Sequence, residues 1–260
     1  MLSCGKESFS IMLLPYNKNV KDCFNRAAET YDAACDLQKN IGNKLINLTS
    51  NHSHRAEIII DLGCGTGLFT EKIAVSYKLC KQIYAIDIAD RLLIAARKRL
   101  QTYNIKFVEE SFETFHFSNL LFDLAFSNMA LHWSKDLGTT VANIYKNLSN
   151  GGTFAFSIPM FGTFLELRSN LVLPFYTLED ICSNLQENNF KLFHVSCIKE
   201  IQKFDTKLEA LKSIKLVGAN YYGASQNDKA HLSELLQSRK SFGKAFNLTY
   251  NIGFFIAMKN

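Results

Sequence analysis

The sequence lacks several features that would assign the protein to a class at once. No stretch approaches the ~18 consecutive apolar residues that span a bilayer. The short apolar patch Ile11–Leu14 is not followed by a small-residue cleavage site. Lys and Arg form no cluster with interleaved aromatic residues, and the net charge of +5 is modest. We therefore expect neither a membrane protein nor a nucleic-acid-binding protein.

The cysteines show no metal-binding pattern. The seven form no C-x-x-C pair, and none has a histidine at metal-ligand spacing. Their odd number and scattered placement predict reduced thiols, a cytoplasmic protein and no bound metal. The 47% hydrophobic content of the 260 residues is sufficient for one α/β domain with insertions.

The most informative stretch is IIIDLGCGTG, residues 58–67. A β-branched apolar run precedes Asp61, and glycines follow at Gly63, Gly65 and Gly67. Such a run is typical of a central strand in a parallel sheet. Glycine permits positive φ and lets a ligand approach the backbone. Because an apolar pattern with helical spacing begins at Leu68, the stretch predicts a nucleotide-type site at the carboxyl end of a sheet.

The glycine spacing distinguishes between nucleotides. A dinucleotide fingerprint needs Gly or Ala at position 68, which is Leu here, so the pattern is G-x-G-x-G. This stretch resembles motif I of the class I S-adenosylmethionine-dependent methyltransferases. The resemblance implies S-adenosyl-L-methionine as the cofactor, with contacts from five residues: Asp61, Gly63, Cys64, Gly65 and Gly67. A dinucleotide enzyme and a glycine turn without a ligand are the alternatives.

Strand and helix patterns alternate after this stretch, which predicts a doubly wound, Rossmann-like α/β sheet with helices on both faces. The resemblance implies seven strands with the last one reversed. We predict strands at Ile58–Asp61, Gln82–Asp87, Ile105–Val108, Phe122–Ser127, Thr153–Ile158, Phe190–Ile198 and Tyr250–Met258. We predict helices at Leu68–Tyr77, Ala89–Leu100, Asp136–Leu148, with Asn150-Gly151-Gly152 as its stop, and Leu178–Asn188.

Four segments follow from this pattern. We expect residues 1–55 to form an N-terminal helical segment, with one amphipathic helix over Lys18–Leu48 that covers the cofactor cleft or packs across a sheet edge. Residues 56–198 form the cofactor-binding core. Residues 199–248 form a helical lid insertion, with helices at Leu208–Val217 and Asp228–Arg239. Residues 249–260 contribute the final strand of the core sheet.

Further cofactor contacts are expected where the next strands end. Asp87 ends the second strand about 20 residues after the glycines, where an acid accepts hydrogen bonds from both ribose hydroxyls. Its alternative role is to cap the following helix. In the methyltransferase family the turn after the third strand binds the adenine. The best register assigns this role to Ser111 and Phe112, with Glu110 as the alternative.

The loop after the fourth strand lines the same edge of the predicted sheet. Asn128 and Met129 are placed to present backbone carbonyls to the ammonium group of the cofactor. His132 and Trp133 follow, and we predict that they form a wall of the methyl-transfer site. The alternative for Trp133, the single tryptophan, is packing against the helix that begins near Asp136.

Three stretches narrow the resemblance. FNRAAETYDAACDLQ (24–38), SNMALHW (127–133) and LKSIKLVGAN (211–220) occur in the order seen in the biotin-pathway malonyl-acyl-carrier-protein O-methyltransferases, and the similarity spans nearly the whole chain. The resemblance implies methylation of the free carboxylate of a malonyl thioester, carried by an acidic acyl-carrier protein or by coenzyme A. Several family members have Arg in the third stretch, where this chain has Lys212 and Lys215.

This reaction needs few catalytic groups. A carboxylate is already ionised at pH 7, since its pKa is about 4, so no general base is required. A cation that binds the distal carboxylate selects malonyl over acetyl, and Lys215 is the candidate. The Tyr31 hydroxyl is placed to donate a hydrogen bond to the same group. Two alternatives are a methyltransferase of another small carboxylic acid or phenol, and a non-catalytic S-adenosylmethionine-binding regulatory protein.

Overall fold

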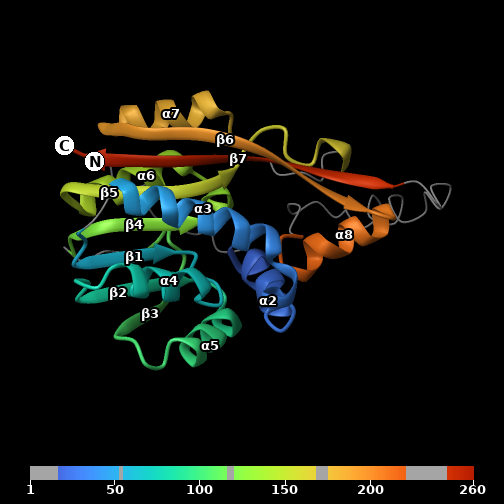
Figure 1. Ribbon diagram of the computed structural model, residues 1–260, viewed down its shortest axis with the longest axis horizontal. Helices are drawn as coiled ribbons and strands as arrows, with labels where there is room; N and C mark the ends of the chain where they lie inside the picture. The colour runs from blue at the N-terminus through green and yellow to red at the C-terminus, as the bar shows by residue number, and fades with distance from the viewer. Residues whose placement is uncertain (1–16, 53–54, 116–119, 168–174, 221–244) are drawn as a thin grey trace, which may run out of the picture.

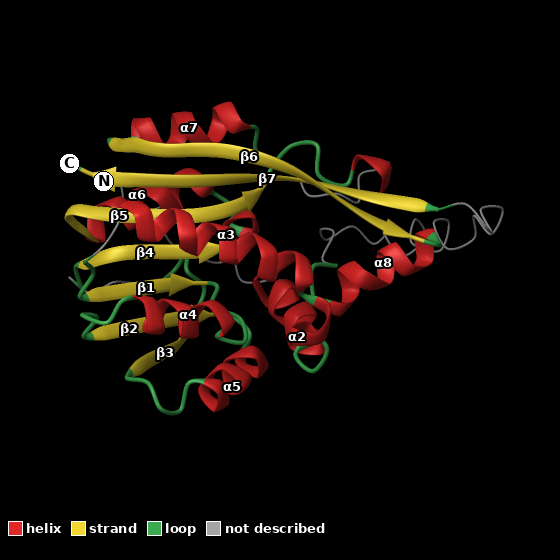
Figure 2. Cartoon of the chain, in the orientation of Figure 1, coloured by secondary structure: helices red, strands yellow, loops and turns green. Residues whose placement is uncertain are grey.

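The computed structural model describes residues 17–52, 55–115, 120–167, 175–220 and 245–260. Its centre is a seven-stranded sheet, as predicted, and the strand order is β3-β2-β1-β4-β5-β7-β6 (Figures 1 and 2). β7 runs antiparallel to both of its neighbours, and the first five strands are parallel. The strands are β1 (Ile58–Leu62), β2 (Gln82–Asp87), β3 (Ile105–Glu109), β4 (Phe122–Asn128), β5 (Leu148–Pro159), β6 (Phe190–Phe204) and β7 (Phe246–Lys259).

Helices cover both faces of the sheet (Figure 1). One face packs against α3, α4 and α8 through a buried apolar cluster. The other packs against α6 and α7. The helices are α2 (Tyr31–Ala34), α3 (Asp36–His52), α4 (Leu68–Ser76), α5 (Asp90–Arg99), α6 (Leu137–Asn147), α7 (Leu178–Glu187) and α8 (Lys207–Leu216). In the described part of the chain, no helix has the length and apolar character needed to cross a bilayer.

The central strands are buried on both faces, which explains their continuous apolar sequence. Ile59 and Ile60, adjacent in β1, are both fully buried and belong to the clusters on opposite faces. β5 contributes stacked aromatic rings, since the centroids of Phe154 and Phe156 lie 4.5 Å apart. This core fixes the carboxyl ends of β1, β2 and β4 at one edge of the sheet, where the glycine loop lies.

The N-terminal helical segment is broken, whereas a single helix was predicted over Lys18–Leu48. Residues 17–27 are helical, residues 28–30 form a turn, and Cys35 separates α2 from α3. Each piece docks on a different element. Asn25 bonds Asp90 at the start of α5, and the Thr30 hydroxyl donates to the carbonyl of Leu216 at the end of α8. Tertiary contacts therefore override a helical periodicity that continues through the break.

Other boundaries also differ from the prediction, among them the start of the last strand, β7, which begins at Phe246 and not at Tyr250. The helix predicted to end at Leu148 ends at Asn147, because Leu148 is fully buried and pairs with Phe122 as the first residue of β5. Gly151 and Gly152 therefore lie inside β5, at a shift in its register, and do not stop the helix. β6 continues past Ile198 to Phe204, paired with β7 throughout.

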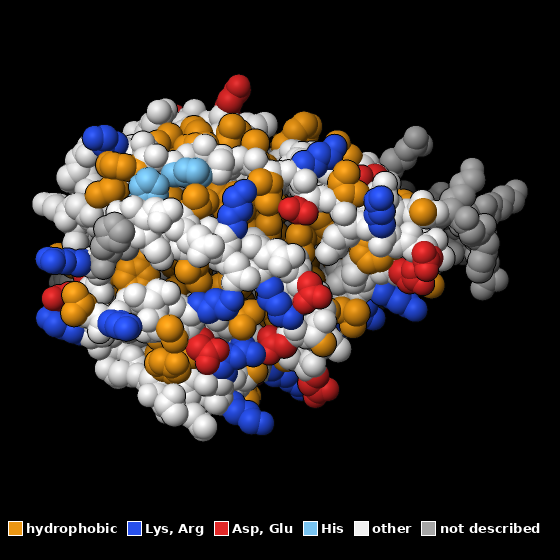
Figure 3. All heavy atoms as spheres, viewed as in Figure 1, with side chains coloured by type: hydrophobic (Ala, Val, Ile, Leu, Met, Phe, Trp, Pro, Cys, Tyr) orange, Lys and Arg blue, Asp and Glu red, His pale blue; other side chains and the backbone are white. Residues whose placement is uncertain are grey.

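The segment that was predicted to form a lid, residues 199–248, is only partly described. β6 and β7 run past the neighbouring strands as a two-stranded arm, and α8 lies beside it (Figure 1). The helix predicted over Asp228–Arg239 lies outside the described residues. On the face shown in Figure 3, positive and negative side chains are interspersed.

Candidate active site

The glycine loop joins β1 to α4 in a conformation that only glycine adopts without strain. Gly63, Gly65 and Gly67 have φ of 75°, 56° and 78°. The backbone N–H groups of Gly63 and Cys64 both donate to the Ile86 carbonyl, at 2.9 and 3.0 Å. These bonds join the loop to the end of β2, where Asp87 lies.

The three glycines meet different surroundings. A Cβ on Gly63 would lie 2.4 Å from the Cβ of Ala130, and one on Gly67 would lie 2.7 Å from Leu100. These two glycines permit close packing of the loop against the protein. Apart from its chain neighbours, no atom of the described residues lies within 4 Å of a Cβ built on Gly65. Gly65 therefore leaves open space for a ligand, whereas Gly67 lines neither of the cavities described next.

Two adjoining cavities open beside the loop. The larger has a volume of about 610 Å³ including its mouth, and the smaller about 360 Å³. Both are lined by Tyr31, Gly63 and Asn128, so one elongated ligand can extend from the first into the second. The larger cavity is within the size range of small-molecule sites. Its lining also includes Asn17, Val20, Phe24, Gly65, Asp87, Ile88, Leu92, Ser111, Phe112, Met129, Ala130 and Trp133.

Asp87 lies in the wall of the larger cavity. Its Oδ2 accepts from the Gly65 N–H and its Oδ1 from the Ala89 N–H, both at 2.8 Å. The second bond reaches the residue that precedes α5, and Asp87 does not cap the N–H groups of that helix. Burial raises the pKa of Asp87 to about 6, and the two backbone bonds oppose this shift.

Asp61 lies in the wall of the smaller cavity. Its Oδ2 accepts a 2.6 Å bond from the Thr70 hydroxyl of α4. Burial raises the pKa of Asp61 to about 7, and the carboxylate of Asp87 adds to this effect. Two buried carboxylates that repel each other, and that form no ion pair within the described residues, are suited to a positively charged ligand.

The loops after β3 and β4 complete the larger cavity. Ser111 and Phe112 line it, and Glu110, the alternative considered above, is not part of the lining. Asn128 and Met129 also line it. The Asn128 amide donates to the Gln38 carbonyl of α3 and accepts from the Ser157 hydroxyl, which fixes its orientation.

The three predicted catalytic residues lie at different places. Tyr31 lines both cavities, and burial raises the pKa of its hydroxyl, so this group stays protonated and able to donate. Trp133 is buried in the wall of the larger cavity, in edge contact with Phe24. Lys215 is exposed in the last turn of α8 and lines neither cavity.

His132 packs outside the lining. Its ring lies between those of Trp133 and Phe175, with centroids 4.8 and 6.0 Å away. Burial lowers its pKa to about 3, and no group in the described residues bonds its buried Nδ1. A neutral His132 therefore supports the wall formed by Trp133 and carries no charge at neutral pH.

Sequence reasoning missed several lining residues. Phe24 and Val20 come from the first helical piece of the N-terminal segment, Cys35 from the break before α3, and Gln38 from the first turn of α3. The apolar positions of this segment predict burial, but not against which element. Ile88 is the residue after Asp87, and Leu92 lies in α5. The helical pattern after β2 was the signal that could have placed both residues near the site.

The chemistry of the lining fits S-adenosylmethionine. The open space at Gly65 accommodates a ligand close to the backbone, and Asp87 and Asp61 offer carboxylates to hydroxyl groups and to a cation. Apolar walls from Phe112 and Trp133 suit a purine ring or an acyl group. In the described part of the chain, no group of three or more His, Cys, Asp or Glu is arranged to hold a metal ion.

Comparisons with known proteins agree with this geometry. A family model described as "Methyltransferase domain" matches residues 60–156. The chain is similar to malonyl-[acyl-carrier protein] O-methyltransferase 2 of Coxiella burnetii, with 35% identity covering 96% of this chain and 99% of that protein. It is also similar to the malonyl-[acyl-carrier protein] O-methyltransferase of Priestia megaterium, with 32% identity over 77% of this chain and 81% of that protein.

Solved structures share the fold at low sequence identity. The YcgJ protein of Bacillus subtilis superposes with a TM-score of 0.64 at 16% identity, covering 84% of this chain and 98% of that one. The N-methyltransferase NodS of Bradyrhizobium japonicum, in complex with S-adenosyl-L-homocysteine, superposes with a TM-score of 0.56 at 16% identity. It covers 88% of this chain and 98% of that one.

Proposed function

The chain belongs to the malonyl-[acyl-carrier protein] O-methyltransferases, and we propose that it esterifies the free carboxylate of malonyl-acyl-carrier protein early in biotin synthesis, with S-adenosylmethionine as the methyl donor. The observation that carries this proposal is the 35% identity to one such enzyme over 96% of the chain. The paired cavities with Asp87 and Asp61 in their walls support the cofactor assignment.

The residues at the site suit a direct methyl transfer. When bound, the cofactor supplies a methyl group on a positively charged sulfur. A malonyl carboxylate oxygen forms a bond to the methyl carbon as the carbon–sulfur bond breaks, which yields the methyl ester and S-adenosylhomocysteine without release of a proton. The protein therefore has to align the groups and exclude water, and needs no general base.

We assign the orienting role at the carboxylate to Tyr31. Tyr31 lines both cavities, and its hydroxyl stays protonated at neutral pH. A hydroxyl donor there stabilises a carboxylate without adding a base. The Tyr31→Phe variant is expected to lower kcat more than it changes the KM for S-adenosylmethionine.

Lys215 is the proposed source of malonyl selectivity. The lysine is exposed, but the next residue, Leu216, accepts the hydrogen bond of Thr30, the residue before Tyr31. This contact supports a position for Lys215 near the mouth of the site. If the Lys215→Ala variant discriminates malonyl from acetyl substrates as well as the parent protein does, Lys215 does not have this role.

We favour an acyl-carrier protein over coenzyme A as the carrier, since the relatives are named for that substrate.

We also propose a cytoplasmic location. The six cysteines in the described part are free thiols, which supports a reducing compartment. Titration of all seven thiols in freshly isolated protein tests this location, and a disulfide would contradict it.

Growth rescue tests the proposed role. A bacterial strain without its own malonyl-acyl-carrier-protein methyltransferase is expected to grow without biotin when it expresses this chain. The Asp87→Asn variant, produced at the same level, is expected to fail. Absence of rescue by folded parent protein would contradict the assignment.

A further inference from the structure

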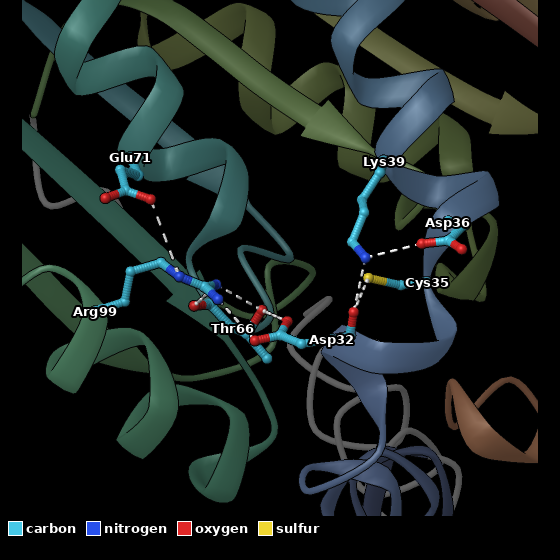
Figure 4. A network of polar contacts seen from close by, with 7 residues as sticks. All are labelled: Asp32, Cys35, Asp36, Lys39, Thr66, Glu71 and Arg99. Carbon is cyan, nitrogen blue, oxygen red and sulfur yellow. Dashed lines mark hydrogen bonds and ion pairs between the residues drawn. The ribbon is translucent and has the colours of Figure 1, made fainter.

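Asp32 forms a closed network with the glycine loop and α5 (Figure 4). Its Oδ1 accepts a 2.6 Å bond from the Thr66 hydroxyl, and its Oδ2 lies 2.7 Å from Nη2 of Arg99. Nη1 of Arg99 donates to the Thr66 carbonyl at 2.7 Å and to the Thr66 hydroxyl at 3.0 Å. Three segments that are distant in sequence are thus joined through Thr66, which lies between Gly65 and Gly67.

Both the hydroxyl and the backbone carbonyl of Thr66 form hydrogen bonds in this network. The hydroxyl donates to Asp32 and accepts from Arg99, and Thr66 is 2% exposed. The planar guanidinium of Arg99 contacts Asp32 and Thr66 at the same time, which a lysine ammonium on a flexible chain cannot reproduce. These directional hydrogen bonds therefore fix the position of Asp32 relative to the glycine loop. Attraction between opposite charges alone would not.

Stability alone is a weak explanation for this pair. The side chains of Arg99 and Asp32 are 24% and 46% exposed, and ion pairs with such access to water contribute little to folding. A second pair on the same segment provides the comparison. Asp36 pairs with Lys39 at 2.9 Å with its side chain 81% exposed, and Asp36 contacts neither the loop nor a cavity (Figure 4).

The residue beside Asp32 lies at the site. Tyr31 and Asp32 are adjacent in α2, a single turn of helix between the Thr30 turn and the break at Cys35. Tyr31 lines both cavities, while Asp32 lines neither and bonds Thr66, a loop residue in the wall of the smaller cavity. The Asp32 carbonyl also accepts from Nζ of Lys39, at 2.8 Å. Backbone and side chain of Asp32 are therefore both held.

We infer that Asp32 is a positioning residue: through Thr66 and Arg99 it holds Tyr31 across the junction of the two cavities and so keeps the bound cofactor in place. This inference rests on the proposed function only for the identity of the cofactor. It assigns to the N-terminal segment a direct effect on cofactor release. Breaking the network frees Tyr31 without removing any group that lines the cavities.

Binding of S-adenosylhomocysteine tests the inference without any methyl acceptor. Trp133, the single tryptophan, lines the larger cavity beside Phe24 of the same segment, so its fluorescence reports ligand binding there. Stopped-flow displacement gives the dissociation rate, and calorimetry gives the affinity. We expect Asp32→Asn to accelerate dissociation about tenfold, equivalent to about 1.4 kcal/mol. Asp36→Asn, the matched control, is expected to stay within about twofold of the parent protein.

A double-mutant cycle separates positioning from general stability. If Asp32 acts through Tyr31, Asp32→Asn has little further effect on the dissociation rate in a Tyr31→Ala background. Additive effects of the two changes, or an Asp32→Asn variant that behaves like Asp36→Asn, would overturn the inference. Should Asp32→Asn fail to fold, Arg99→Lys keeps the charge and breaks the same network, with the same expected rate. If the double-mutant cycle gives the expected result but the protein does not methylate malonyl-acyl-carrier protein, only the proposed function is refuted.

Discussion

The ring of Phe24 lies against Gly218, so closely that a Cβ on this glycine would come within 2.7 Å of the ring and 2.9 Å of the Phe24 backbone. Beside this contact, the Thr30 hydroxyl donates a 2.9 Å bond to the Leu216 carbonyl. Two of the stretches that carry the family resemblance, residues 24–38 and 211–220, therefore meet in space. Their contact holds the N-terminal segment over the site.

Substitution of Gly218 tests this contact. Gly218 has φ of 73°, and Gly151, at a φ of 74°, has no atom within 4 Å of its Cβ position. Gly151→Ala is expected to cost about 1 kcal/mol of unfolding free energy, for the backbone conformation alone. Gly218→Ala is expected to cost about 1–3 kcal/mol more because of the clash. Urea unfolding measures both, and equal losses would show that Phe24 does not restrict this position.

Gly65→Ala tests whether the open space at the loop belongs to the ligand. The added methyl group meets no protein atom within 4 Å, so its effect on stability should match that of Gly151→Ala. Affinity for S-adenosylmethionine should nevertheless fall about tenfold or more, which is at least about 1.4 kcal/mol. Isothermal calorimetry measures the affinity of both variants. Unchanged binding by Gly65→Ala would mean that the cofactor does not approach this glycine.

Asp87→Asn removes the carboxylate that we assign to the ribose. Loss of charge-assisted hydrogen bonds of about 1.5–3 kcal/mol should weaken cofactor binding by about one to two orders of magnitude. Asp90→Asn is the matched control, because Asp90 bonds Asn25 and Lys21 and lines neither cavity. Equal affinities of the two variants would contradict the ribose assignment.

Cofactor affinity should depend on pH through Asp87. Burial raises the pKa of Asp87 to about 6, and ribose hydroxyls donate to the ionised form. Affinity is therefore expected to fall as the pH drops below about 6, approaching tenfold per pH unit because binding then releases one proton from Asp87. Calorimetric titrations between about pH 5 and 8 measure this slope. A slope equally steep in Asp87→Asn would assign the proton to another group.

The stability of the ligand-free protein should change with pH in a related way. Burial raises the pKa values of Asp61 and Asp87 to about 7 and 6, from ordinary values of 3.8. At a pH between the ordinary and the raised pKa values, the folded state binds more protons than the unfolded chain. The contribution of both groups to stability therefore rises as the pH falls from about 7 to 4. Replacing both by Asn should remove this trend from urea-unfolding curves. A trend retained in the double variant would contradict the raised pKa values.

Much of the core follows from local sequence patterns. The apolar runs of β1, β2 and β4 are buried on both faces, so their composition alone identifies them. The glycine spacing and the acid at the end of β2 predicted where the cavity lies, since parallel strands end at one edge. The residues Gly63, Gly65 and Asp87 line it at the expected places.

The remaining features depend on contacts between distant segments. The apolar spacing through Tyr31 and Cys35 continues a helix, whereas the bonds of Thr30 to Leu216 and of Asp32 to Thr66 and Arg99 hold the broken segment in place. Lys199 and Lys203 are exposed residues of β6 that resemble a polar loop, although their pairing with β7 continues. A single residue pattern does not contain such pairings.

Transfer of a labelled methyl group from S-adenosylmethionine to purified acyl-carrier proteins tests the account most directly. We expect labelled ester on malonyl-acyl-carrier protein, slower labelling of malonyl-coenzyme A, and no label on acetyl-acyl-carrier protein, which has no free carboxylate. Folded protein that binds the cofactor and labels none of these acceptors would contradict the account.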